Sequence, residues 1–149
     1  MPQFENGAAS VYYETTGSGR PLLLIAGTAT DCTSWGALLP LLPSRQYILI
    51  DNRGSGQTRV DGPIELAEMV DDCAALLDHL GLERVDVVGH SLGGFLGLAL
   101  AATHPERVNP TRPARPATHG KSWGYGASGP DGAVRLAGPL VSGCGWRTG

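Results

Sequence analysis

Short runs of consecutive apolar residues recur along the first part of the chain. Two of them occupy residues 21–26 and 47–50, and a third, over residues 85–88, is apolar apart from Asp86. Runs without polar alternation are typical of strands that are covered on both faces in a parallel sheet. The three runs therefore predict the central strands of such a sheet.

Segments with helical periodicity separate these runs. Over residues 64–80, apolar side chains recur at spacings of three and four and stop before Gly81, which predicts an amphipathic helix. A second helix is expected from Leu92 to about Thr103, where Pro105 follows, and a short one within residues 34–42.

The chain opens with a turn signal, Asn6-Gly7, followed by residues rich in β-formers, so residues 4–8 and 11–14 predict an antiparallel hairpin. The later alternation of strand and helix predicts crossover connections. The expected fold class is α/β, with a wound, mostly parallel sheet.

The composition changes after residue 108. Residues 109–149 contain nine glycines and five prolines, with five basic residues and one acidic residue. Prolines at positions 110, 113 and 116 are incompatible with a central strand. We expect an ordered domain over residues 1–108 and an irregular tail rich in Gly, Pro and Arg over residues 109–149.

Length and charge limit the function classes. A chain of 149 residues with 42% hydrophobic content suits one modest domain. The net charge of −3, without a basic cluster before residue 110, argues against nucleic acid or an anionic membrane as partner. With no transmembrane run or secretory signal, the prediction is a cytoplasmic protein that binds a small-molecule substrate.

No cofactor and no metal are predicted. Cys32, Cys73 and Cys144 are widely spaced and form no Cys-x-x-Cys pair, so buried reduced thiols are expected. A nucleotide-binding sheet would need a Gly-x-Gly-x-x-Gly turn or a P-loop lysine, but the only lysine is Lys121, in the tail. The Gly-Ser-Gly run within residues 51–58 lacks the Gly-Lys-Ser/Thr ending of a P-loop.

A Gly-x-Ser-x-Gly motif, formed by Gly89, Ser91 and Gly93, lies directly between the third strand and the second helix. A sharp turn at this junction would project the serine hydroxyl from the end of the sheet. The alternative is that Ser91 only caps the helix, since serine is a favoured N-cap residue.

Four segments together resemble the α/β-hydrolase family: residues 22–27, 51–56, 89–94 and 104–108. The resemblance runs from about residue 10 to residue 108. It implies that Ser91 is the nucleophile of an acyl transfer on an ester, lactone or amide, with a covalent acyl-enzyme intermediate. Serine at position 91 disfavours the relatives that use an aspartate nucleophile.

The resemblance also implies an oxyanion hole made by the backbone N–H groups of Thr28 and Leu92. The family commonly has His-Gly before the first of these donors, whereas this chain has Ala26-Gly27. Because the donor is a backbone group, that difference need not remove it. Trp35 is expected to pack in the core, and the loop over residues 51–58 to be structural.

The acid and the base of a catalytic triad are not identified. In the family both follow the nucleophile, the acid before the histidine. His104 and Glu106 lie at the end of the helix after Ser91, which points them away from it, whereas His119 and Asp131 lie in the tail in the reverse order. Both triad positions therefore stay unknown.

Two functions follow. The first is an esterase-like serine hydrolase whose activity is impaired because acid and base are absent. The second is a catalytically inactive fragment, or a ligand- or partner-binding module on the same scaffold. The abrupt end of the resemblance near Val108 suggests a frame shift or truncation, with a genuine extension as the alternative. The strand over residues 85–88 would then be an open sheet edge, which predicts self-association.

Overall fold

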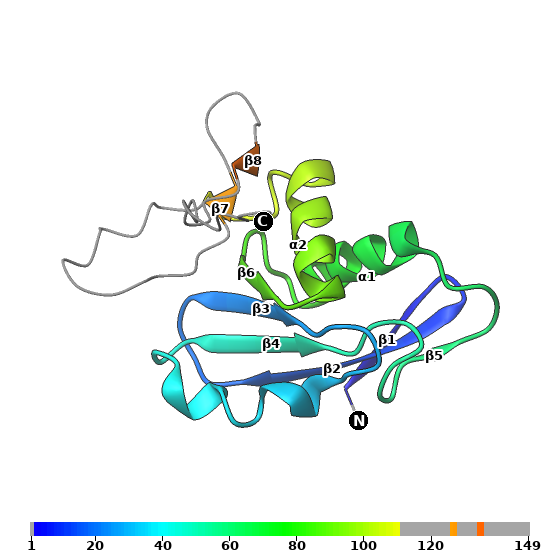
Figure 1. The fold of residues 1–149 in the computed structure, drawn as a ribbon, viewed down its shortest axis with the longest axis horizontal. Helices are drawn as coiled ribbons and strands as arrows, with labels where there is room; N and C mark the ends of the chain where they lie inside the picture. The colour runs from blue at the N-terminus through cyan, green and yellow to red at the C-terminus, as the bar shows by residue number, and fades with distance from the viewer. Residues whose placement is uncertain (1, 111–125, 128–133, 136–149) are drawn as a thin grey trace, which may run out of the picture. The chain divides into compact units, whose positions relative to one another are not determined.

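The computed structural model describes residues 2–110, 126–127 and 134–135. The chain divides into two units, Met1–Asn109 and Pro110–Gly149, and each is described by itself. The first unit is an α/β layer structure (Figure 1). Its elements, in chain order, are β1 (Gln3–Asn6), β2 (Ala9–Thr16), β3 (Pro21–Ile25), the 3-10 helices η1 (Cys32–Trp35) and η2 (Leu39–Leu41), β4 (Gln46–Ile50), β5 (Arg59–Val60), α1 (Leu66–His79), β6 (Asp86–Gly89) and α2 (Leu92–Thr103).

The sheet of this unit has the strand order β1-β2-β4-β3-β6, with β5 paired to β2. The three strands predicted from the apolar runs are neighbours, because β3 pairs in parallel with β4 on one side and with β6 on the other. β1 and β2 form the predicted antiparallel hairpin, and β2 joins it to β4. The predicted α/β class with a mostly parallel central sheet is confirmed.

Both faces of β3 and β4 are buried, which explains why their sequences are apolar without alternation. The predicted coverage on both faces is wrong for β6, whose residues are half-buried or exposed. On one face Leu23, Ile25, Ile48 and Ile50 join the core under α1 and α2. On the other face Leu22, Leu24, Tyr47 and Leu49 pack with residues of η1, including Trp35. The expectation that Trp35 packs in the core is therefore confirmed, since its side chain is buried.

The single helix predicted within residues 34–42 is wrong, because this segment forms the two short 3-10 helices η1 and η2. Asp31 caps η1 by accepting a hydrogen bond from the Thr33 N–H, and Gly36 ends it. Pro40 lies at the start of η2. Because proline has no N–H and its ring clashes with the carbonyl four residues earlier, it interrupts a continuous α-helix.

The edge of the sheet at β6 also differs from the prediction. Val85 precedes β6 and forms a parallel bridge with Val108, through bonds from the Val85 N–H to the Arg107 carbonyl (3.0 Å) and from the Asn109 N–H to the Val85 carbonyl (2.8 Å). One β-bridge to a further segment therefore lies beyond the predicted edge of the sheet. Self-association through the rest of this edge stays a prediction.

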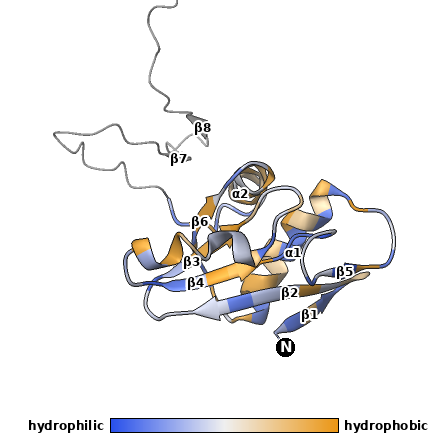
Figure 2. Cartoon of the chain, turned by 60° about the horizontal axis from the view of Figure 1, so that its bottom comes forward, coloured by the Kyte–Doolittle hydropathy of each residue, from blue (hydrophilic) through white to orange (hydrophobic). Residues whose placement is uncertain are grey.

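Helix α2 is apolar around most of its circumference, as Figure 2 shows by its hydrophobic colouring. Only Gly93, Leu96 and Leu100 of this helix are buried. Phe95 is 55% exposed, and Val88 of β6 is 44% exposed. A helix that is apolar all round is usually buried. Residues 2–110 therefore leave part of the apolar surface of α2 and β6 uncovered.

In the second unit, Gly126–Ala127 (β7) and Val134–Arg135 (β8) pair as a two-residue antiparallel ladder. The composition of the tail did not predict this pairing. In the part of the chain that the structure describes, no helix is long and apolar enough to cross a membrane.

Asp86 forms ion pairs that link the beginnings of the three parallel strands. Its carboxylate pairs with Arg20, which precedes β3, at 2.7 Å, and with Arg45, which precedes β4. Burial by itself would raise the pKa of Asp86, but the hydrogen bond from Arg45 and the further polar contacts outweigh it and lower this pKa. The charged form therefore stabilises the fold.

We expect Asp86→Asn to lower the free energy of unfolding by about 1–2 kcal/mol at pH 7, as for a partly buried charged hydrogen bond. Because the pKa is lowered in the folded state, this contribution is present above the unfolded pKa of about 3.9 and is lost as pH falls through the folded pKa. Urea unfolding of both proteins at pH 7 and pH 3 measures it. Asp71→Asn, on the exposed side of α1, is the control. An equal difference at both pH values would contradict the role of the charge.

Candidate active site

Ser91 occupies the turn between β6 and α2 with a strained backbone. Its φ is 53° and its ψ −124°, a conformation that L-residues rarely adopt. Although Ser91 stands at the N-cap position, its side chain makes no capping hydrogen bond. The residue is exposed. The helix-capping alternative is therefore wrong, and the strained turn leaves Ser91 exposed.

Close backbone packing explains the two glycines of the motif, because neither position has room for a Cβ. A Cβ at Gly93 would lie 2.0 Å from the Ile25 carbonyl oxygen, and a Cβ at Gly89 would lie 2.2 Å from the Gly93 carbonyl oxygen. Backbone therefore packs directly on backbone at both positions. Only glycine allows β3, β6 and the start of α2 to approach this closely.

Two unpaired backbone donors lie on the segments that meet beside Ser91. Leu92 is the first residue of α2, and Thr28 follows the end of β3; neither N–H has an acceptor among residues 2–110. The segment after β3 lies against the turn, because a Cβ at Gly27 would be 3.0 Å from the Cβ of Ser91. The N-terminus of α2 adds the positive end of its dipole. The arrangement can stabilise a negative charge that develops next to Ser91.

The loop after β4 has the structural role expected for Asp51 and Arg53. The Asp51 carboxylate accepts hydrogen bonds from the N–H groups of Cys32 (2.7 Å) and Gln57 (2.8 Å). The buried Arg53 binds both carboxylate oxygens of Asp72 in α1, at 2.7 and 3.0 Å. The hydrogen bond to Asp72 raises the pKa of Arg53, so the guanidinium stays charged.

Two side chains that the sequence reasoning did not single out contact the segment after β3. The Asn52 amide donates to the Ala26 carbonyl at 2.8 Å. The His90 Nε2 accepts a hydrogen bond from the Gly27 N–H at 3.3 Å. Asn52 lies in the loop over residues 51–58, and His90 lies in the Gly-x-Ser-x-Gly motif. Neither sequence pattern indicates which backbone group the side chain of Asn52 or His90 contacts.

The candidate triad partners within residues 2–110 lie away from Ser91. His104 ends α2, with its Nδ1 3.6 Å from the Glu106 carboxylate, whereas Ser91 precedes the helix. The twelve residues of α2 separate them by about 18 Å. The Ser91 hydroxyl has no hydrogen-bond partner among residues 2–110. His119 and Asp131 lie outside the described residues.

The two described cysteines are unsuited to nucleophilic chemistry. Cys32 and Cys73 are buried and form no disulfide within the described ranges. Burial raises the pKa of Cys73 to about 12 and raises that of Cys32 as well. No group of His, Cys, Asp or Glu side chains in those ranges is arranged to hold a metal ion. Ser91 is therefore the nucleophile candidate of this region.

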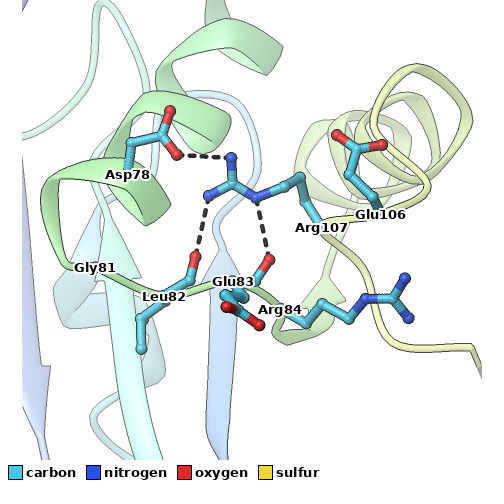
Figure 3. Close-up of a pocket in the computed structure, with 7 residues that line it drawn as sticks. All are labelled: Asp78, Gly81, Leu82, Glu83, Arg84, Glu106 and Arg107. Carbon is cyan, nitrogen blue, oxygen red and sulfur yellow. Dashed lines mark hydrogen bonds and ion pairs between the residues drawn. The ribbon is translucent and has the colours of Figure 1, made fainter.

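A hollow of about 540 Å³ lies at the other end of β6, and Figure 3 shows its lining side chains. Arg107 uses its donors for structure there. It pairs with Asp78 at 2.7 Å and donates to the carbonyls of Leu82 (3.0 Å) and Glu83 (3.1 Å). These contacts attach the segment after α2 to the end of α1. The hollow is thus separate from Ser91, which follows β6.

Comparison with known proteins places this geometry in a family. A family model described as the alpha/beta hydrolase fold matches residues 20–109, more than half of the chain. The protein named "Putative carbamate hydrolase RutD" of Azorhizobium caulinodans is 42% identical over 110 residues, covering 72% of this chain and 42% of that protein. The 2-hydroxymuconate semialdehyde hydrolase of Pseudomonas sp. strain CF600 is 37% identical over 99 residues, covering 62% of this chain and 35% of the relative.

Solved structures agree. A carboxylesterase structure from Nitrososphaera gargenis superposes with a TM-score of 0.69 at 29% identity, over 73% of this chain and 43% of that one. The chain spans less than half the length of each of these relatives. The match with the family model covers β3 through α2, which includes the turn at Ser91. The chain belongs to the α/β-hydrolase fold family.

Proposed function

We propose that this chain provides the nucleophile and the oxyanion hole of a serine hydrolase that acts on an ester, lactone or amide. The backbone of Ser91 is the observation that supports it most: φ is 53° in a non-glycine residue, and the side chain is exposed without a capping bond. Strain of this kind costs about 1–3 kcal/mol and is concentrated at functional sites.

The proposed chemistry has two steps. The Ser91 Oγ attacks the substrate carbonyl carbon while its proton passes to a base, and the carbonyl oxygen becomes an oxyanion facing the N–H groups of Thr28 and Leu92. Collapse of this intermediate expels the protonated alcohol or amine and leaves an acyl-enzyme. Water then adds to the acyl carbon and releases the acid and the Ser91 hydroxyl.

No base contacts Ser91 among residues 2–110, so we expect the chain by itself to be slow. A site that keeps only the oxyanion hole and substrate binding retains about a thousandfold acceleration over water. The relatives named as a carbamate hydrolase and a carboxylesterase favour a carbonyl of the acyl type as the target.

Labelling with a fluorophosphonate tests this proposal. We expect the folded chain to be phosphonylated at Ser91, as located by peptide mass spectrometry, faster than the same chain unfolded in urea. Ser91→Ala should abolish the labelling. The exposed Ser34 in η1 provides an internal control for general serine reactivity.

Labelling that is absent, or that is equal in the folded and unfolded chain, would contradict the hydrolase proposal. It would favour the second candidate, a binding module that uses the same scaffold without chemistry. That candidate is supported by the lack of a hydrogen-bonded partner for the Ser91 hydroxyl within residues 2–110.

A further inference from the structure

The peptide group between Ala26 and Gly27 is held at both of its polar ends. Its carbonyl oxygen, on Ala26, accepts the buried hydrogen bond from the Asn52 amide at 2.8 Å. Its N–H, on Gly27, donates to the His90 ring at 3.3 Å. The two side chains come from different elements, the loop after β4 and the turn after β6. A peptide fixed at both ends cannot rotate without breaking one of the two bonds.

The next peptide group along the chain bears the N–H of Thr28. Thr28 has no acceptor among residues 2–110, and the residue after it, Ala29, has a positive φ of 57°. The segment lies close to the nucleophile turn, because a Cβ on Gly27 would be 3.0 Å from Ser91 and from the His90 ring. The carbonyl of this same peptide group, on Gly27, accepts hydrogen bonds from the Thr30 hydroxyl at 2.9 Å and from the Thr30 N–H at 3.4 Å. The orientation of the Thr28 N–H is therefore set jointly by Thr30 and by the fixed peptide before it.

We propose that Asn52 and His90 clamp the Ala26–Gly27 peptide and thereby aim the Thr28 N–H at the oxyanion position beside Ser91. Both are positioning residues, because they act through the backbone and not on substrate. The proposal rests on the hydrolase function proposed above, although the clamp itself is a property of the folded chain. It gives a role to two residues whose motifs left them unexplained.

The His90 ring is placed for this role by its own surroundings. Its backbone N–H donates to the Ile25 carbonyl at 3.3 Å, which extends the pairing of β3 and β6 by one residue. The Trp35 ring meets it edge to face, with centroids 5.2 Å apart. To accept at Nε2, the ring must be neutral with its proton on Nδ1.

The variants His90→Phe and His90→Gln separate the hydrogen bond from the packing. Phenylalanine keeps a ring against Trp35 but has no acceptor, whereas glutamine loses the ring and keeps an oxygen near the position of Nε2. Asn52→Asp replaces the amide donor with an acceptor of the same shape. His104→Leu, at the far end of α2, is the control for replacing a histidine.

The primary measurement is the hydrogen-exchange rate of the Gly27 amide by NMR, together with the nitrogen shifts of the His90 ring. We expect an unprotonated Nε2 in the parent chain and exchange roughly five- to tenfold faster in His90→Phe, as for the loss of one hydrogen bond. His90→Gln and His104→Leu should stay near the parent rate. Asn52→Asp should also accelerate the exchange, and near-UV circular dichroism checks that it is folded.

Fluorophosphonate labelling of Ser91 in the same variants tests whether the clamp aims the donor. We expect a loss of about tenfold in His90→Phe and near-parent labelling in His90→Gln, a fraction of what removing an oxyanion donor costs. Unchanged Gly27 exchange in His90→Phe would overturn the clamp. Faster exchange with unchanged labelling would overturn its positioning role. If the parent chain is not labelled at all, the hydrolase proposal fails, while the exchange rates still decide the clamp.

Discussion

Gly93→Ala is expected to destabilise the fold by about 3 kcal/mol or more, because the added methyl group has no room. The new Cβ would lie 2.0 Å from the Ile25 carbonyl oxygen and 2.6 Å from that of Ala26. Both obstacles are backbone atoms of β3 and the segment after it, so no side-chain rotation can relieve the overlap. The start of α2 would have to move away from the sheet.

The neighbouring glycine provides a matched control. A Cβ at Gly94 would lie 3.4 Å from its nearest neighbour, the Gly89 carbonyl oxygen, which is an ordinary contact. Alanine is favoured over glycine within a helix by about 0.5–1 kcal/mol. Gly94→Ala should therefore be neutral or slightly stabilising. Urea unfolding followed by circular dichroism compares the two, and equal effects would show that close packing at Gly93 is not limiting.

Ser91→Gly is expected to abolish labelling while it stabilises the chain. Glycine adopts a φ of 53° without the steric cost that serine has there, which we estimate as about 1–2 kcal/mol. Ser91→Ala should abolish labelling equally but keep the strain, since alanine has a Cβ. The difference in unfolding free energy between the two variants therefore measures the strain stored at the nucleophile turn.

Unfolding curves of the parent chain, Ser91→Gly and Ser91→Ala are the measurement, with phosphonate labelling in parallel. If Ser91→Ala gains as much stability as Ser91→Gly, the backbone of Ser91 is not strained. In that case the turn offers no support for the proposed nucleophile. A gain confined to glycine would show that the fold tolerates an unfavourable conformation at this one residue, as expected where function requires it.

The sequence predicted the central strands and the long helices well for a physical reason. Strands β3 and β4 are buried on both faces and so are apolar at every position, and α1 buries one stripe and so repeats at three and four. The prediction of a helix within residues 34–42 was wrong. The apolar residues of this segment, including Trp35, pack on the second face of the sheet and do not form the stripe of an α-helix. Pro40 was the local signal against that helix.

At the candidate site the sequence identified Ser91 and the glycines around it through a motif in the right context. It did not reveal that the Ser91 side chain makes no capping hydrogen bond to α2 or that Gly93 lies against β3. Nor did it reveal that Asn52 and His90 bind the same peptide group. The backbone φ of Ser91 and the contact between residues 26 and 52 depend on how the strands pair and how the segments after them pack. No local sequence pattern encodes either feature.

By itself, then, the sequence determined the α/β class, the order of the hairpin, the three parallel strands, α1 and α2, and the serine at the turn, but it did not indicate β5. These follow from burial and from local turn chemistry, both of which act over a few neighbouring residues. Only the tertiary structure decided which strands are neighbours, that Val108 pairs with Val85 beside β6, and which side chains hold the segment after β3. Those features depend on parallel pairing across crossovers, where residues far apart in the chain come into contact.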